Sequence, residues 1–155
     1  MRSFARFLTI LSLVVWVGGI IFFSAVVAPA LFSSFEKPEL AAGVVGVSLT
    51  ALHWIGLGCG VVLFVLTFLV PPGKARAVRT LVGSMILLTA IAQFVVMPQM
   101  QRIRNLVGGS IEALPQKDAA RAAFDRLHQF SVGLEGATLV AGMVVIGFIS
   151  QETKE

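Results

Sequence analysis

Charged residues are scarce in this chain. Of 155 residues, only 13% are charged and 57% are hydrophobic, whereas a soluble domain usually has about 25% charged residues. A surface so poor in charge must face something other than water. The chain also has a single cysteine, Cys59, so no disulfide can form within it. The composition therefore indicates a membrane protein whose fold does not depend on a disulfide.

Several signatures of catalysis and ligand binding are also missing. The sequence has no tandem repeat, low-complexity tract, Gly-rich phosphate loop or zinc-type Cys/His cluster. The formal net charge of +4 comes mostly from Lys and Arg at helix ends, where these side chains can meet lipid headgroups. We therefore expect membrane lipid and no nucleic acid as a partner. Any chemistry must depend on single polar residues inside the membrane.

Long apolar segments dominate what is present. About 20 apolar residues suffice to cross a bilayer, and four segments meet this requirement, at about 7–33, 40–70, 80–101 and 127–150. The first segment is far longer than the ~7–15 apolar residues of a secretory signal, so we interpret it as a retained helix. The sequence predicts an all-α integral membrane protein, with a bundle of four transmembrane helices in a single membrane domain over 1–155.

The basic residues predict the orientation of the helices. Lys and Arg in short loops favour the cytoplasmic side. Arg2 and Arg6 precede the first span, and the loop between the second and third spans contains three more basic residues, Lys74, Arg76 and Arg79. Lys154 brings this side to six basic residues. The other side also has six, namely Lys37 and five in the connection between the third and fourth spans. Because the first helix usually dominates, we place both termini in the cytoplasm, at a bacterial plasma (inner) membrane.

The connection between the third and fourth spans is expected to be partly helical. Pro115 is a favourable first residue for a helix, and 116–129 has an apolar side. A fourth helix from about Pro115 to Ile149 would be roughly 50 Å long at 1.5 Å per residue, whereas the bilayer core is ~30 Å thick. Helices 3 and 4 should therefore extend beyond the bilayer together, with a turn at 108–110.

Small and polar residues recur at helical spacing in every span. The four stripes are Ser12, Trp16 and Gly19; Ala42, Gly46, Thr50, His53, Gly56 and Gly60; Thr89, Gln93 and Met97; and His128, Ser131, Glu135, Thr138 and Gly142. Residues at this spacing share one helix face. Gly133, Ala137 and Ala141 form a second ridge on the fourth span, which predicts that neighbours clasp this helix on two sides. Most of these residues are also ordinary packing devices in membrane bundles.

Glu135 needs a specific explanation. A carboxylate at membrane depth costs about 3 kcal/mol or more unless it is paired, hydrated or protonated. Counting from the predicted helix ends places His53 and Gln93 at a similar level in the outer half of the bundle. We therefore expect Glu135 to face the interior with a neutral or hydrogen-bonded carboxyl group. In one interpretation Glu135 and His53 share a proton or hold a cation, and in the other they form a pair that only fixes the helix register.

The residues above Glu135 predict the mouth of a ligand pocket. His128 lies at the bilayer surface at the top of the polar stripe, with Ser131 one turn below it. Arg102 and Arg104, on the extension of helix 3, would attract anionic headgroups or an anionic ligand. A simply solvated His128 is the alternative.

A metal site is a further hypothesis for the same region. Met97 and Met100 place two thioethers at the outer end of helix 3, and thioethers with the imidazole of His128 are a soft-metal combination that could hold copper. The two methionines could instead fill packing gaps.

An ordered set of short motifs resembles a known membrane family. The motifs are Trp16-Val-Gly-Gly19; Val27-Ala-Pro29-x-Leu31-Phe32; Met97-Pro98 followed by Arg102 and Arg104; and Arg121-x-x-Phe124-x-x-Leu127-His128-x-x-Ser131. Together they resemble, over most of the chain, the four-helix family of unknown function that includes vertebrate transmembrane protein 205. The family's characteristic residues in the last helix map onto His128 and Ser131, whereas Glu135 stands where an Asn is expected.

That resemblance implies a link to metals or haem. The family is distantly similar to the copper-resistance D-type membrane domains and to the haem-associated protoporphyrinogen-oxidising membrane proteins. Haem or copper is therefore the cofactor that the resemblance implies. His53 is not among the residues that can be carried over from the family.

Three functions remain open at this point. The leading hypothesis is a non-enzymatic membrane protein that binds or conducts a small ligand or ion through a polar pocket in the outer half of the bundle. The second is a haem- or metal-associated redox protein with His53 or His128 as an axial ligand, although these residues are expected at different depths. The third is a scaffold or assembly factor whose small-residue ridges dock partner helices or a second copy of the chain.

Overall fold

Four long helical segments make up almost the whole chain. The computed structural model describes residues 2–69, 71, 73–108, 110–111 and 113–151, and these residues contain no strand. Gly109 and Lys154, which entered the predictions above, lie outside them. The four segments Ser3–Ser34, Pro38–Leu69, Ala75–Val107 and Ala119–Gln151 are long and apolar enough to cross a membrane. This confirms the prediction of an all-α, four-helix integral membrane protein.

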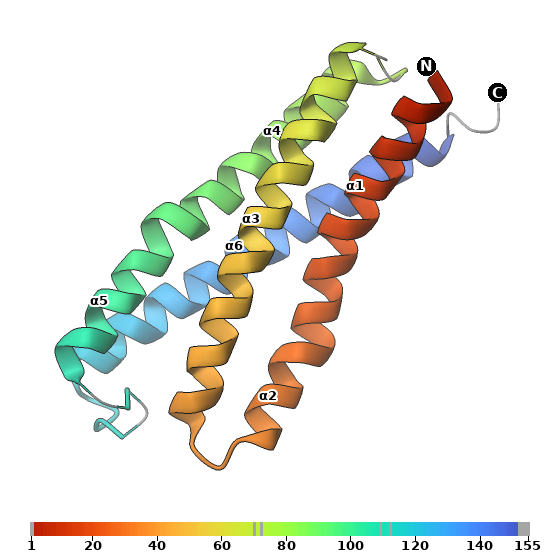
Figure 1. Ribbon diagram of the computed structural model, residues 1–155. Helices are drawn as coiled ribbons and strands as arrows, with labels where there is room; N and C mark the ends of the chain where they lie inside the picture. Colours follow the sequence, from red (N-terminus) through yellow and green to blue (C-terminus); the bar gives the residue numbers. More distant parts are fainter. Residues whose placement is uncertain (1, 70, 72, 109, 112, 152–155) are drawn as a thin grey trace.

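The segments form two hairpins that lie side by side (Figure 1). The first hairpin consists of α1 (Arg2–Phe22), η1 (Phe23–Val27), α2 (Ala28–Ser34) and α3 (Pro38–Leu69). The second hairpin consists of α4 (Ala75–Ile91), η2 (Ala92–Val96), α5 (Met97–Val107) and α6 (Ala119–Gln151). The connections α2–α3 and α5–α6 lie at one end of the bundle, here called the loop end. The α3–α4 connection and both chain ends lie at the other, the terminal end.

All four segments exceed the thickness of a bilayer core. Each has 32 or 33 residues, or roughly 50 Å at 1.5 Å per residue, against ~30 Å of hydrocarbon. Helices 3 and 4 therefore have the expected extra length, and the first two segments are equally long.

The first helix of each hairpin contains a π-turn just before a proline. In η1 the N–H of Ala28 donates to the carbonyl of Phe23, and in η2 the N–H of Met97 donates to the carbonyl of Ala92, so both bonds span five residues. Pro29 and Pro98 follow immediately. A proline ring clashes with the carbonyl four residues before it, and a widened turn relieves this clash without ending the helix. Both helices therefore continue past their prolines.

The last helix begins one turn later than the sequence predicts. Asp118 precedes α6, and its Oδ1 accepts hydrogen bonds from the backbone N–H groups of Ala120 at 2.8 Å and Arg121 at 3.3 Å. An Asp side chain in this position satisfies the unpaired N–H groups of a helix start. Pro115 instead accepts a turn hydrogen bond from the N–H of Asp118. The start predicted near Pro115 is therefore wrong, because the capping residue overrides the proline.

Glycines allow close packing in the terminal half of the bundle. A Cβ atom on Gly56 would lie 2.4 Å from Nε1 of Trp16, and one on Gly60 would lie 2.7 Å from a side-chain carbon of Ile86. Trp16 is fully buried against these two glycines. The Gly56-x-x-x-Gly60 ridge is thus used within the chain, by α1 and α4.

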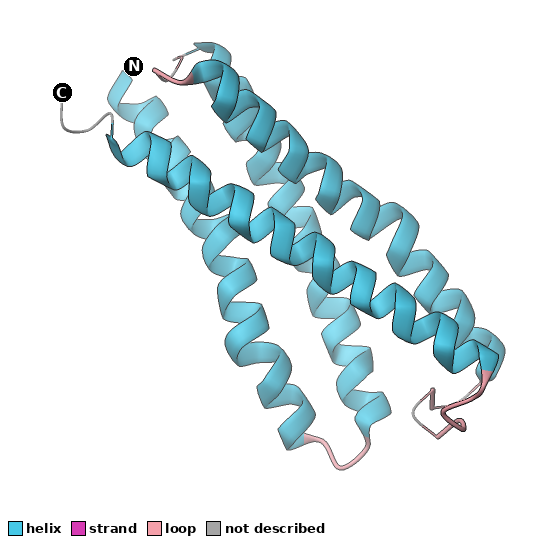
Figure 2. Cartoon of the chain, turned by 180° about the vertical axis from the view of Figure 1, so that it is seen from behind, coloured by secondary structure: helices cyan, strands magenta, loops and turns pink. Residues whose placement is uncertain are grey.

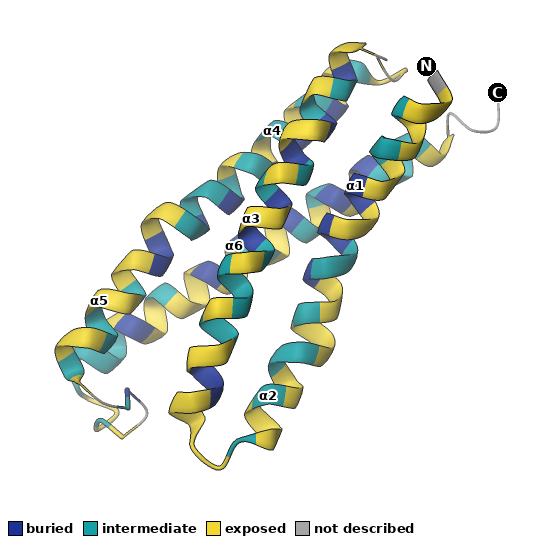
Figure 3. Cartoon of the chain, in the orientation of Figure 1, coloured by how far each residue is buried: buried dark blue, intermediate teal, exposed yellow. Residues whose placement is uncertain are grey.

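The exposed residues of the bundle lie along the outward faces of its helices (Figure 3) and include many large apolar side chains. Among these are Phe4, Val47, Leu69, Phe94 and Val140. A soluble protein rarely exposes apolar surface on this scale, so this surface suits contact with lipid.

The small-residue ridge of α6 lies on this outer surface. Gly133 and Ala137 are exposed and Ala141 is half-buried, and a Cβ atom on Gly133 would meet nothing within 4 Å. Although α6 contacts both α4 and α1, the prediction that its small-residue ridge packs against neighbouring helices is wrong within this chain. The polar stripe on the opposite side of α6 faces the interior instead, where Ser131, Thr138 and Gly142 are buried.

Candidate functional site

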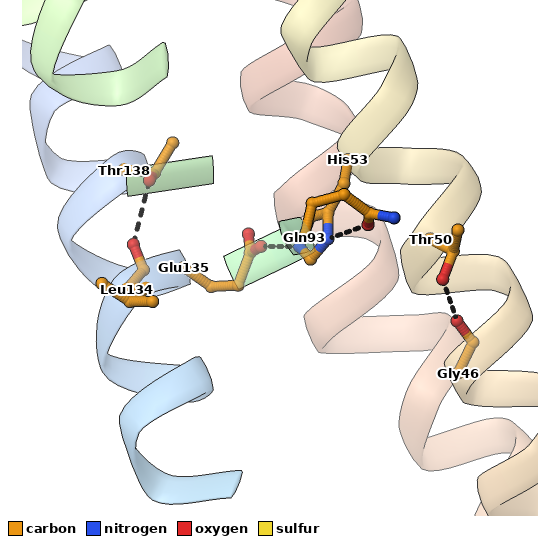
Figure 4. A network of polar contacts seen from close by, with 7 residues as sticks. All are labelled: Gly46, Thr50, His53, Gln93, Leu134, Glu135 and Thr138. Carbon is orange, nitrogen blue, oxygen red and sulfur yellow. Dashed lines mark hydrogen bonds and ion pairs between the residues drawn. The ribbon is translucent and has the colours of Figure 1, made fainter. Parts of the chain in front are cut away.

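A buried histidine joins the two hairpins near the middle of the bundle. His53 on α3 has a side chain that is only 1% exposed. Its Nε2 lies 2.5 Å from Oε1 of Glu135 on α6, and its Nδ1 lies 2.9 Å from Oε1 of Gln93 in the π-turn η2 (Figure 4). The inward orientation of Glu135 and its contact with His53 are confirmed. Gln93 reaches the same site, as its predicted level in the bundle indicated.

His53, Glu135 and Gln93 form a hydrogen-bonded triad. Their hydrogen-bond partners determine where its protons lie. The amide oxygen of Gln93 can only accept, so Nδ1 of His53 must carry a hydrogen. If His53 is neutral, its Nε2 has no hydrogen and Glu135 must donate one. If Glu135 is ionised, both ring nitrogens carry hydrogens and His53 is a cation. In either case one proton lies between Nε2 and Oε1, and the pair has no net charge.

This neutrality explains how the membrane interior tolerates the triad. An unpaired charge inside the bilayer costs several kcal/mol, whereas a neutral pair with both ring nitrogens bonded avoids that penalty. The neighbouring hydroxyls do not supply the partners. Thr138 donates to the carbonyl of Leu134 at 2.9 Å, and Thr50 donates to the carbonyl of Gly46 at 2.9 Å. The proton of each threonine is therefore used on its own helix.

A cavity of about 720 Å³ separates the two hairpins on the loop-end side of the triad. The hairpins diverge toward the loop end in both views of the chain (Figures 1 and 2). Residues from α1, η1, α2, α3, α5 and α6 line the cavity, and most of these are apolar. Glu135 lines it at the side nearer the middle of the bundle, with 16% of its side chain exposed. Neither His53 nor Gln93 lines it, so Glu135 alone connects the cavity with the triad.

The predicted mouth residues divide between the cavity and the outer surface. His128, Ser131 and Arg104 all line the cavity together with Glu135, whereas Arg102 does not and is exposed. Arg102 therefore does not belong to the mouth in this structure. Residues two apart point to nearly opposite sides of a helix, so only one of the two arginines can face inward.

Arg104 spans the gap between the hairpins. Its Nη1 donates to the carbonyl of Ala42 on α3 at 3.4 Å, and its guanidinium carbon lies 5.2 Å from the ring centre of Phe124 on α6. The second contact has the geometry of a cation–π interaction. Arg104 thus links α5 to α3 and α6 at the loop end of the cavity.

The candidate metal ligands share the same cavity without forming a recognisable carboxylate or histidine cluster. Met97, Met100 and His128 all line it. Within the described residues, no three His, Cys, Asp or Glu side chains are grouped as metal ligands. His53 could serve as a haem ligand only by giving up a hydrogen bond, because both of its ring nitrogens are engaged.

Sequence reasoning missed three polar residues of the cavity. Ser24 in η1, Gln101 on α5 and Asp125 on α6 all line it. Ser24 is not part of the polar stripe of the first span. Pro29, five residues after Ser24, was the available signal, because a proline within an apolar helix indicates a distortion there.

Comparison with known proteins gives one match. The model of the family described as Domain of unknown function (DUF4149) matches residues 11–106, which include His53 and Gln93 but not Glu135. No curated protein and no solved structure matches the chain. The resemblance to transmembrane protein 205 and to copper-resistance D-type domains gains no support from these comparisons.

Proposed function

This chain belongs to the DUF4149 family, named for a domain of unknown function, and we propose from the geometry of its site that it binds a small ligand in the cavity between its two hairpins. The ligand contacts the carboxyl group of Glu135, and the apolar lining holds the remainder of the molecule. The observation that carries this proposal is the position of Glu135, which lines the cavity and is also bonded to the buried His53.

The exposure of Glu135 favours a binding site over a purely structural pair. A hydrogen bond that only fixes the register of two helices is strongest when both groups are enclosed, because the low local dielectric strengthens it and water cannot compete. His53 meets this condition with 1% exposure, whereas 16% of the Glu135 side chain remains open to the cavity. The carboxyl group is therefore accessible from the cavity on one side and hydrogen-bonded to His53 on the other.

The cavity has the size and character of a small-molecule site. Such sites are commonly about 300–1,000 Å³, mostly apolar, with a few polar groups that orient the ligand. The cavity of about 720 Å³ falls within this range. It also lies between two similar hairpins, as substrate sites do in many transporters built from repeats.

The proposed setting is a bacterial plasma (inner) membrane, with the terminal end of the bundle in the cytoplasm. The cavity would then open toward the outer leaflet. Ligands that partition into lipid would reach it from that leaflet.

Two glycines on α6 give a matched test of ligand binding. A Cβ atom would meet nothing within 4 Å at either Gly136 or Gly133, but only Gly136 lines the cavity. Gly136→Leu should therefore fill the cavity, and Gly133→Leu should add the same side chain to the outer surface. The neutral compound 1-adamantanol serves as the probe. A ligand that binds only the folded protein raises its melting temperature.

We expect 1-adamantanol to raise the melting temperature of the wild type and of Gly133→Leu in detergent, and to leave that of Gly136→Leu unchanged. An equal rise in all three proteins would place binding outside the cavity. If the wild type showed no rise with 1-adamantanol or with its ammonium and carboxylate analogues, the proposed function would be wrong.

A further inference from the structure

We propose that the ligand of this cavity is a protonated lipophilic amine, and that its binding releases the proton that His53 and Glu135 share. The inference rests on the proposed function and adds the chemical class of the ligand and its coupling to a proton. It follows from the hydrogen-bond pattern of the triad, from the charge balance of the site and from the positions of the other charged residues around the cavity.

The triad offers only hydrogen-bond acceptors to the cavity. Nδ1 of His53 donates to Gln93, and the one proton of the His53–Glu135 pair lies between Nε2 and Oε1. Whether that proton is closer to nitrogen or to oxygen, the remaining lone pairs of the Glu135 carboxyl group can only accept. A ligand that meets this group must therefore donate a hydrogen bond. Carboxylates, ketones and quinones, which only accept, do not match it.

Charge balance favours an ammonium group over a neutral donor. The resting pair is neutral, and a cation next to it would give the site a net charge of +1 in apolar surroundings. Loss of the shared proton restores neutrality, because the ammonium ion then pairs with the Glu135 carboxylate beside a neutral His53. Charge-assisted hydrogen bonds are roughly twice as strong as neutral ones. A neutral alcohol forms no ion pair with Glu135 and does not displace the shared proton.

The exchange of cation for proton balances without a further reactant. The N–H bond at Nε2 of the imidazolium form breaks, the electron pair stays on nitrogen, and the proton passes to water. His53 keeps its hydrogen on Nδ1, where Gln93 accepts it. The ammonium group donates to the carboxylate of Glu135 in place of the imidazolium. One positive charge enters the site and one leaves.

The other charged or titratable residues of the cavity lie too far away to reverse this preference. Arg104, Asp125 and His128 line its loop-end part. Asp125 and His128 precede Glu135 by ten and seven residues, or about 15 and 10 Å along the helix axis. The guanidinium of Arg104 lies beside the ring of Phe124, eleven residues before Glu135. At an effective dielectric constant of about 20, unit charges interact by about 1 kcal/mol at 15 Å but about 4 kcal/mol at 4 Å. Glu135 therefore dominates the electrostatics at its end of the cavity.

Three probes with one carbon skeleton test the preference for a cation. They are 1-adamantylammonium, 1-adamantanol and 1-adamantanecarboxylate, and titration calorimetry of the detergent-purified protein measures the affinity for each. Titration in two buffers of different ionisation enthalpy also counts the protons released. At pH 7 we expect the ammonium probe to bind about tenfold more tightly than the alcohol, which corresponds to ~1.4 kcal/mol. We also expect release of close to one proton for each ammonium ion bound.

Asp125 provides the matched control for Glu135, because both carboxylates line the cavity on α6. Glu135→Gln should lose the tenfold preference and the proton release, and Asp125→Asn should keep both. The wild-type proton count also tests the proposal if Glu135→Gln fails to fold.

The outcomes separate the two proposals. If 1-adamantanol binds the wild type and Gly136→Leu blocks it, while the ammonium probe binds no more tightly and releases no proton, the amine assignment is wrong and the binding function stands. Tighter binding of the carboxylate probe would likewise overturn the amine assignment and would point to Arg104 and His128 as the recognition groups.

Discussion

Gly60 and Gly142 occupy matching positions in the two hairpins. Each glycine leaves room for one side chain of its own hairpin and one of the other: Trp16 and Ile86 against Gly60, and Met85 and Val17 against Gly142. Trp16 and Val17 are consecutive, as are Met85 and Ile86. These reciprocal contacts, together with the two π-turns before Pro29 and Pro98, indicate that the second hairpin repeats the structure of the first. The amino-acid sequence shows no corresponding tandem repeat.

The close contact at Gly142 predicts a large effect from one added methyl group. A Cβ atom there would lie 2.5 Å from Cγ2 of Val17 and 3.2 Å from Cε of Met85. The short, branched Val17 side chain cannot swing away, so the helices must separate. We expect Gly142→Ala to lower the free energy of unfolding by about 1–3 kcal/mol, measured by unfolding in mixed dodecyl maltoside and SDS micelles.

Gly133→Ala is the control for that measurement. It lies on the same helix, and its Cβ atom would have open space around it. The substitution should leave stability unchanged or raise it by up to about 1 kcal/mol, because alanine is the better helix former. Equal effects of Gly142→Ala and Gly133→Ala would show that the contact with Val17 does not limit the approach of the helices.

Gln93 is predicted to hold His53 in one tautomeric arrangement. The amide oxygen accepts from Nδ1 at 2.9 Å, so nitrogen NMR of histidine-labelled protein should show a hydrogen on Nδ1 of His53. The chain has only two histidines, and His128→Gln assigns the two sets of signals. Gln93→Met should remove this constraint and cost about 1–3 kcal/mol, because a buried donor loses its partner. A wild-type His53 with a hydrogen on Nε2 alone would contradict the arrangement.

The inward stripes of the sequence predicted the triad because helical geometry determines both orientation and depth. A spacing of three and four residues aligned Glu135 with Ser131 and Thr138, both of which are buried. Counting along straight helices then placed His53 and Gln93 at the level of Glu135. These inferences needed only the period and rise of a helix, and the membrane cost of a carboxylate supplied the reason to expect a partner.

The cavity and the choice of Arg104 over Arg102 could not be predicted in the same way. The π-turn η2 adds a residue to one turn before α5, and so rotates every later side chain relative to a continuous α-helix. Helical counting across Pro98 therefore loses its phase. The divergence of the hairpins toward the loop end depends on packing between distant segments, which one sequence does not reveal.

The orientation of the bundle remains a prediction from the positive charges. With both termini in the cytoplasm, green fluorescent protein fused after Glu155 should fluoresce, and alkaline phosphatase fused at the same position should be inactive. A fusion after Lys37, in the α2–α3 connection, should give the opposite pair of results. An active phosphatase after Glu155 would show that the cavity opens toward the cytoplasm.

The structural repeat predicts that His53 and Glu135 can exchange places. Each lies seven residues before the matching glycine of its hairpin, Gly60 or Gly142, and their side chains meet between the two hairpins. His53→Glu alone would bring two carboxyl groups together, and Glu135→His alone would bring two imidazoles together. Breaking a buried pair typically costs about 3–5 kcal/mol. We expect each single variant to lose a large part of that amount, and the double variant to recover most of it.

The recovery should be incomplete by about one hydrogen bond, or ~1 kcal/mol, because Gln93 would no longer face a histidine. Ser24 precedes Pro29 by five residues, as Gln93 precedes Pro98, so Ser24 is the matching position in the first hairpin. Adding Ser24→Gln and Gln93→Ser to the double variant should therefore restore the third member of the triad and the remaining stability. Unfolding in mixed dodecyl maltoside and SDS micelles measures the stability of all of these variants. A double variant no more stable than the weaker single variant would show that the two positions are not equivalent, and that the hairpins resemble each other only in their backbones.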